Sequence, residues 1–200
     1  GLSAAGLEYE YVDTGVIGSD AIKVGLIYKA GSVAPGGDYR ILDQSVDARF
    51  NDGKNRPVLA QTFRQLSNGA LFTVAVNHLK SKGSDCDDVG DPNRNDGQGN
   101  CNRTRTFAAA ALAEWSQGDP TGAGTRRALV IDDLNAYLRE DPLRALEDGG
   151  LVNLLERDRG DLAYSYVYGG RAGALDHALA TPALADRVTR AGAWHSNADE

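Results

Sequence analysis

The chain has 200 residues, of which 42% are hydrophobic, and it carries a formal net charge of −7. This composition can bury a substantial core, so we expect a single domain over residues 1–200. No apolar run approaches a membrane span, and no signal peptide opens the sequence. The acidic balance argues against a protein that coats nucleic acid with surplus Lys and Arg, whereas it is compatible with an enzyme that gathers carboxylates around a cation.

Hydrophobic patterns predict a mixture of strands and helices. Strands are expected over residues 9–12, 21–30, 57–65, 70–79, 128–131, 164–168, 174–180 and 188–194, and helices over residues 104–117, 142–146 and 182–187. Between the third and fourth strands, Ser67, Asn68 and Gly69 supply turn chemistry, which predicts a hairpin. Regular βαβ spacing is absent, so the pattern favours mixed sheets covered by helices.

Two cysteines, Cys86 and Cys101, bracket a polar loop. No neighbouring Cys or His completes a zinc set, so we interpret the pair as a disulfide that closes a surface loop, in an oxidising compartment. Two unrelated buried thiols are the less favoured alternative, because the segment between them is too polar for a core.

The same loop offers a weak calcium-binding pattern. Asp91, Asn93, Asn95 and Asp96 resemble a calcium-ligand series, but Gly97 falls seventh where an EF-hand requires glycine sixth. A solvated loop is the better interpretation, and Ca²⁺ stays an alternative ligand.

Polar residues follow two of the predicted strands. After the apolar residues 128–131, alternation would put Asp133 and Asn135 on one face and Leu134 on the other, and His78 ends an earlier strand. A carboxylate can hold a divalent cation while an amide donates to a phosphoryl oxygen, so the pair suits phosphate chemistry. The alternative is that Asp and Asn only start a turn or cap a helix.

Several motifs occur together in order along the chain. They are Arg56 in NRPVLAQTF, His78 in VNHLKSKGSDC, the segment GDPNRNDGQGNCNRTRT, Asp133 and Asn135 in DLNAYLREDP, and Asp176 in LDHALATPAL. With them, nearly the whole chain resembles the endonuclease/exonuclease/phosphatase superfamily, and within it the secreted bacterial endonucleases.

The resemblance implies a mixed α/β (α+β) fold, a four-layered sandwich of two mixed sheets flanked by helices. It also implies hydrolysis of phosphodiesters in nucleic acid, DNA more than RNA, with Mg²⁺ or Mn²⁺, by a bacterial secreted enzyme. Carried over by motif, His78, Asp133, Asn135 and Asp176 are the expected catalytic residues, Asp133 is also the expected metal ligand, and Arg56 is expected to contact the phosphate backbone.

The chain departs from the family pattern in three places. The family's early asparagine and metal-binding glutamate have no counterpart, since Glu8 and Glu10 lie in another context. Its closing serine-aspartate-histidine box has no counterpart, and Asp132 stands where glycine is usual. The two missing features of the family, together with the absence of methionine, indicate an interior piece of a longer enzyme, incomplete at both ends, and little or no cleavage is expected of these 200 residues alone.

Other polar residues have both functional and structural interpretations. His177 follows Asp176 and would face away from it, so we interpret His177, like His195, as structural. Four basic residues fit two interpretations equally well, contact with a nucleic-acid backbone and simple solvation: Lys80, Lys82, Arg103 and Arg105. Two other functions stay open: a phosphodiesterase or phosphatase acting on lipids or small phosphate esters, and a catalytically silent domain that binds calcium or a partner.

Overall fold

The computed structural model describes residues 8–195, apart from the side chain of Asp132. In chain order the elements are β1 (Tyr9–Tyr11), β2 (Ile27–Lys29), β3 (Val33–Pro35), β4 (Arg40–Leu42), β5 (Arg56–Gln65), β6 (Leu71–His78), the 3₁₀ helix η2 (Asp87–Val89), α1 (Asn102–Gln117), β7 (Ala128–Asp133), α2 (Asp141–Asp148), β8 (Val152–Asn153), α3 (Leu154–Arg159), η3 (Gly160–Leu162), β9 (Tyr166–Tyr168), β10 (Arg171–Gly173), β11 (Asp176–Ala180) and α4 (Pro182–Ala185).

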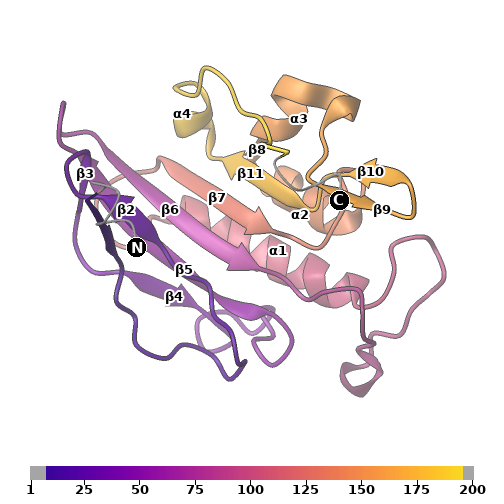
Figure 1. Cartoon of the computed structure of the whole chain (residues 1–200). Helices are drawn as coiled ribbons and strands as arrows, with labels where there is room; N and C mark the ends of the chain where they lie inside the picture. Colours follow the sequence, from indigo (N-terminus) through magenta and orange to yellow (C-terminus); the bar gives the residue numbers. More distant parts are fainter. Residues whose placement is uncertain (1–7, 196–200) are drawn as a thin grey trace.

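Most of these strands form one mixed sheet of seven strands (Figure 1). The order is β3-β5-β6-β7-β11-β8, with β4 also paired to β5. Strands β5 and β6 form the predicted antiparallel hairpin, β6 and β7 run parallel with α1 between them in sequence, and β11 is antiparallel to β7. The predicted mixed α/β class is confirmed.

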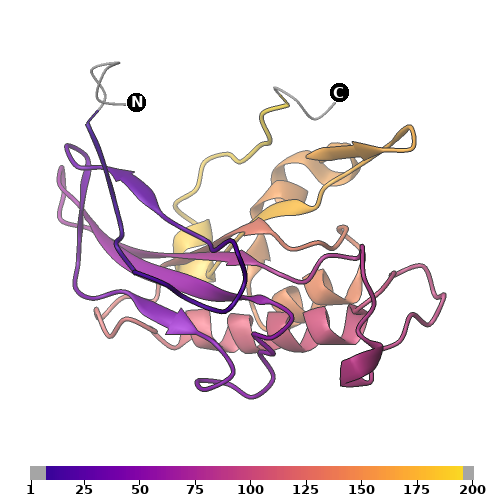
Figure 2. The ribbon, with the colours of Figure 1, turned by 60° about the horizontal axis from the view of Figure 1, so that its bottom comes forward.

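The two faces of this sheet are covered differently (Figure 2). Alternate side chains point to opposite faces, so Ala60, Ala75 and Val130 share a core with α1 and α2. On the other face, Leu59 and Val76 pack under the two-stranded sheet β1-β2. The β11 end of that second face is covered by residues of α3 and α4. Between these two covers, the second face is where a site can open.

Helix α1 packs closely because its buried stripe consists largely of alanine. Ala108, Ala109, Ala111 and Leu112 are fully buried, while Phe107, whose helical spacing from Ala111 and Leu112 predicts the same apolar stripe, is half exposed. Small side chains let the backbone of α1 approach α2 and the sheet. The helix prediction for residues 104–117 is therefore confirmed, although the stripe is rotated relative to the one we expected.

The loop before α1 is fastened at several points. Cys86 and Cys101 form the predicted disulfide, with an S–S distance of 2.08 Å. The buried Asp91 accepts a hydrogen bond from the Thr104 backbone N–H in the first turn of α1 (2.8 Å). The fully buried Arg105 donates to the Lys80 carbonyl at 3.0 Å, so it holds the chain after β6 and cannot track a nucleic-acid backbone.

Two strand predictions are wrong in whole or in part. Of residues 21–30 only Ile27–Lys29 pair as a strand, because the partner β1 is itself three residues long. Residues 188–194 form no strand, because side chains occupy their backbone groups. The Val188 carbonyl accepts from Arg157, and the Ala191 N–H donates to Asp158.

Candidate active site

Four neighbouring strands bring polar side chains to one edge of the large sheet. Arg56 begins β5 and pairs in register with His78, the last residue of β6. Asp176 begins β11 and pairs in register with Asp133, the last residue of β7. Because β6 and β7 are parallel and their outer neighbours are antiparallel to them, these four chain positions meet at the same edge.

The three positions on β6, β7 and β11 also share a face of the sheet. His78 has the parity of Val76, and Asp133 has the parity of Ile131, both of which belong to the core beneath β1-β2. Residues opposite each other across an antiparallel pair lie on the same face, which adds Asp176. The site therefore opens on the face that α1 and α2 leave free.

Asn135 reaches Asp133 by a turn rather than by strand alternation. Its φ of 48° is left-handed, a conformation that asparagine tolerates. The Asn135 backbone N–H donates to Asp133 Oδ1 (2.7 Å), and Asn135 Nδ2 donates to the Leu79 carbonyl (3.0 Å). Leu134 is fully buried in the core under α1. Among the described residues, the other Nδ2 hydrogen of Asn135 has no hydrogen-bond acceptor.

His78 lies beside Asp133 without a hydrogen bond between them. His78 Nε2 is 3.7 Å from Asp133 Oδ2, and the two side chains are 28% and 27% exposed. At this distance a protonated imidazole and the carboxylate attract each other, and a small shift would bring either group to a ligand. Both side chains are thus partly open to solvent at the sheet edge.

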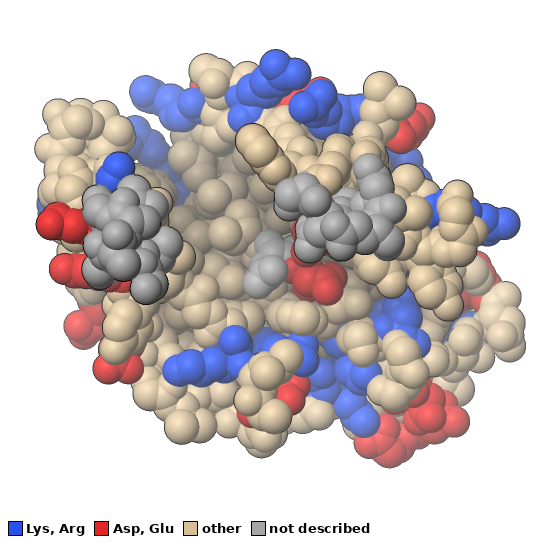
Figure 3. Space-filling model, viewed as in Figure 1, with Lys and Arg blue, Asp and Glu red and all other residues tan. Residues whose placement is uncertain are grey.

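A pocket of about 610 Å³ opens at this edge. Asp133, Asn135 and Asp176 line it together with Lys82 and three tyrosines, Tyr137, Tyr166 and Tyr168, while Ser81, Gly83 and Leu175 complete the lining. Figure 3 shows carboxylates beside a hollow in the middle of this face, with basic side chains gathered below them. A phosphate ester entering the pocket would meet carboxylate, amide and aromatic groups at once.

Arg56 lies at the same edge but is not among the residues that line this pocket. Its Nη2 pairs with Asp20 Oδ2 at 3.0 Å, and the residue lines a separate pocket with residues 17–20 and 52–55. Its Nε is buried without a hydrogen-bond partner among the described residues. The phosphate contact expected of Arg56 would thus compete with Asp20.

The carboxylates suit a hydrated Mg²⁺ rather than a closed protein cage. Among the described side chains of residues 8–195, which leave out that of Asp132, no group of three or more His, Cys, Asp and Glu residues converges as a metal site. Mg²⁺ commonly keeps several waters and takes one or two carboxylates plus substrate phosphates. Asp133 and Asp176, in register on neighbouring strands and lining one pocket, match that donor set.

Sequence patterns predicted no site role for Tyr137, Tyr166 and Tyr168, because these residues fit strands or turns. Lys82 was expected either to contact a nucleic-acid backbone or to be solvated, and not to line the pocket. Lys82 Nζ lies 4.6 Å from the centre of the Tyr137 ring and forms an ion pair with Glu140 at 2.5 Å. Burial lowers the pKa of Lys82 below its ordinary value, although Glu140 opposes that change.

None of the three histidines is among the residues that line the pocket. His177 is buried, with Nε2 2.8 Å from the Ala136 carbonyl. The His195 ring stacks on Tyr164 with centroids 3.7 Å apart.

The expected calcium ligands form turns. Asn93 Oδ1 accepts from the Asn95 N–H and Asp96 Oδ1 from the Gln98 N–H. The described part of the loop thus gives the calcium alternative no support, since Asp91 is used at the start of α1.

Comparisons with known proteins place the fold. No family model and no curated protein sequence matches the chain. Solved structures do match it. An endonuclease/exonuclease/phosphatase from Bacteroides vulgatus has a TM-score of 0.60 at 13% identity, covering 88% of this chain and 65% of its own. A mannosyl-6-phosphatase from Bacteroides thetaiotaomicron has a TM-score of 0.61 at 15% identity, covering 87% and 63%.

A third similar structure is D. rerio TDP2 complexed with a single-strand DNA product, with a TM-score of 0.55 at 13% identity, covering 90% of this chain and 64% of its own. At these identities the likeness concerns the fold, which is that of endonuclease/exonuclease/phosphatase proteins. The chain spans slightly less than two thirds of the length of the three structures.

Proposed function

We propose that this protein hydrolyses phosphodiester bonds in nucleic acid with the help of a divalent cation. The observation that carries the proposal is one pocket lined by Asp133, Asn135 and Asp176, with His78 3.7 Å from the first of them. Phosphoryl transfer needs positioning and neutralisation of charge more than a covalent nucleophile, and these groups supply both. The fold, which the TDP2 structure shares, adds support.

Each residue has a role that follows from its surroundings. Asp133, which accepts a hydrogen bond from the Asn135 N–H, would hold the cation, and Asn135 Nδ2 donates its second hydrogen to a phosphoryl oxygen. Asp176 accepts the proton of the attacking water as the new P–O bond forms. His78, in its protonated form, stabilises the phosphoryl charge and donates a proton to the leaving oxygen as the old P–O bond breaks. A bound Mg²⁺ or Mn²⁺ would polarise the phosphoryl group.

The nucleic-acid substrate and the cellular location have separate support. DNA is proposed ahead of RNA from the sequence resemblance. The disulfide between Cys86 and Cys101 supports an oxidising, extracellular location. Over the described residues no helix is both long and apolar enough to cross a membrane.

The experiment compares Asp133→Asn with the unchanged complete gene product on plasmid DNA in Mg²⁺, with and without chelator. We expect chelator to stop cleavage and Asp133→Asn to slow it by on the order of 100-fold or more. Asp38→Asn, an exposed carboxylate on the segment before β4, is the matched control and should cleave normally.

Cleavage by Asp133→Asn at the unchanged rate would contradict the site assignment. Hydrolysis of small phosphate esters in place of DNA would support the phosphatase alternative. The sequence departures predict little turnover from the 200 residues by themselves, and robust cleavage by them would show that the boxes without counterpart are dispensable.

A further inference from the structure

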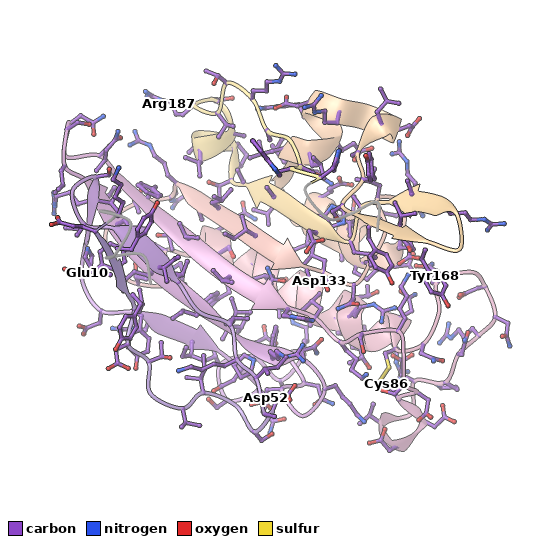
Figure 4. All side chains as sticks on the ribbon, viewed as in Figure 1. Glu10, Asp52, Cys86, Asp133, Tyr168 and Arg187 are labelled. Atoms are coloured by element: carbon purple, nitrogen blue, oxygen red, sulfur yellow. A yellow bond between two sulfur atoms is a disulfide. The ribbon has the colours of Figure 1, made fainter. Side chains whose placement is uncertain are left out.

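Three tyrosines line the candidate pocket together with its two carboxylates. Tyr166 and Tyr168 stand two residues apart on β9, so both side chains point to the same face of the hairpin β9-β10. Their rings are nearly parallel, with 9° between the planes and 6.3 Å between the centroids. Both line the pocket that Asp133 and Asp176 line. Figure 4 labels Tyr168 and Asp133.

These two rings are open to solvent. Tyr166 is 43% and Tyr168 is 73% exposed. These exposed aromatic rings border a polar pocket, where each offers a flat apolar surface to a ligand. The rings are therefore available to stack on a flat group bound in the pocket.

The third tyrosine of the pocket, Tyr137, is held in place by its neighbours. Lys82 lies over the Tyr137 ring, and the Tyr137 N–H donates to Glu140 Oε2 (3.1 Å). On the other side, a Cβ at Gly173 of β10 would come within 2.6 Å of the Tyr137 ring, so the absence of a side chain there permits the contact. Tyr137 thus packs against the hairpin that carries the exposed pair.

We propose that Tyr166 and Tyr168 stack on an unpaired nucleobase whose phosphate lies at Asp133, Asn135 and Asp176. This inference rests on the proposed function and adds a substrate class: single-stranded nucleic acid. Stacking on aromatic side chains suits every base because each base has a π-face. A base inside a duplex already stacks on its neighbours, so only an unpaired or extruded base can use this surface.

The test measures binding rather than cleavage. The 200-residue chain, of which little or no cleavage is expected, is titrated in Mg²⁺ into two fluorescently labelled 12-nucleotide single strands, one with bases and one with abasic tetrahydrofuran sites and the same phosphates. We expect the strand with bases to bind about tenfold more tightly. In Tyr166→Ala/Tyr168→Ala the two strands should bind alike, whereas Tyr166→Phe/Tyr168→Phe should keep the difference.

The chain offers a matched control on β1. Tyr9 and Tyr11 are also two residues apart on a strand and are 40% and 67% exposed, yet they lie outside the pocket lining. Tyr9→Ala/Tyr11→Ala should keep the preference for bases. If the double variant on β9 unfolds, Tyr168→Ala alone, at the more exposed position, should still reduce the difference.

Equal binding of the two strands by the unchanged protein overturns the inference, as does failure to bind either strand or a preference that survives Tyr166→Ala/Tyr168→Ala. The proposed function is judged separately by cleavage. A base preference without cleavage by the complete gene product would leave the stacking surface standing and reject the hydrolase. Cleavage without a base preference would support the hydrolase and reject the stacking surface.

Discussion

At His177, burial opposes protonation. The side chain is 4% exposed, and its Nδ1 is buried without a hydrogen-bond partner among the described residues. Burial lowers the pKa of the His177 imidazole below its ordinary value, with only partial opposition from the Ala136 carbonyl. The native state therefore keeps this ring neutral at pH values where the unfolded chain protonates it.

The free energy of unfolding should consequently fall as the pH drops below about 6.5, the ordinary pKa of histidine. Down to the lower native pKa, the unfolded state binds one more proton, which costs at most about 1.4 kcal/mol per pH unit. Urea unfolding of the unchanged chain and of His177→Gln at pH 7.0, 6.5, 6.0 and 5.5 measures this dependence. An equal slope in both proteins would contradict the prediction.

Most residues of the candidate site were also predicted from residue type and motif. Asp133, Asn135, His78 and Asp176 were named from motifs, and the structure brings all four to one sheet edge, while their catalytic roles stay a prediction. The ion pair between Arg56 and Asp20 could not be predicted, because the two residues are distant in sequence. The position of Asp20 depends on the loop before β2.

At the scale of elements, the contact between α1 and α2 depends on a missing side chain. A Cβ at Gly149, just after α2, would come within 2.5 Å of Ala113 Cβ and 3.1 Å of the Ala145 carbonyl. Neither neighbour is the end of a flexible side chain, so the helices themselves would have to separate. This contact is therefore sensitive to a single methyl group.

Gly149→Ala should lower the free energy of unfolding by about 1–3 kcal/mol, the usual cost of overpacking a core. Gly31→Ala is the matched control, because nothing lies within 4 Å of its added Cβ, and it should change stability by less than about 0.5 kcal/mol. Urea denaturation measures both. Equal stability of the two variants would show that α2 can move at no cost.

Sequence patterns predicted best those elements whose backbone hydrogen bonds follow a regular helix or strand ladder. The β5-β6 hairpin and α1 follow from alternation, turn residues and helical spacing. Helix α3 and the strands β3, β8 and β10 were missed because each is six residues or shorter, too short for periodicity to be read. Residues 188–194 were wrongly assigned because the carboxylate and guanidinium that bind their backbone come from the unpredicted α3.

At the scale of the whole molecule, basic charge is gathered locally although the net charge is −7. The pKa of Lys80 is lowered first by burial and then by the positive charges of Lys54, Arg105 and Arg56. These cations come from separate parts of the chain and meet beside the site edge. A local positive field can attract phosphate even on an acidic protein.

Lys80→Gln should weaken binding of single-stranded DNA to a similar extent for all sequences. It should also reduce the slope of log affinity against log salt concentration by about 0.7, the effect of one phosphate contact on a single strand. Arg187→Gln, an exposed cation away from Asp133 in Figure 4, is the control and should leave the slope unchanged. An unchanged slope in Lys80→Gln would exclude Lys80 from the contact.

The sequence by itself determined the mixed α/β class, the disulfide, the main hairpin, α1 and the identity of the polar residues at the sheet edge, because these depend on periodicity, turn chemistry and residue type. Only the tertiary structure decided that Tyr137, Tyr166 and Tyr168 line the pocket, that Arg56 pairs with Asp20, and that Arg105 is buried. Side-chain direction and burial depend on neighbours supplied by distant segments, and no local pattern contains those neighbours.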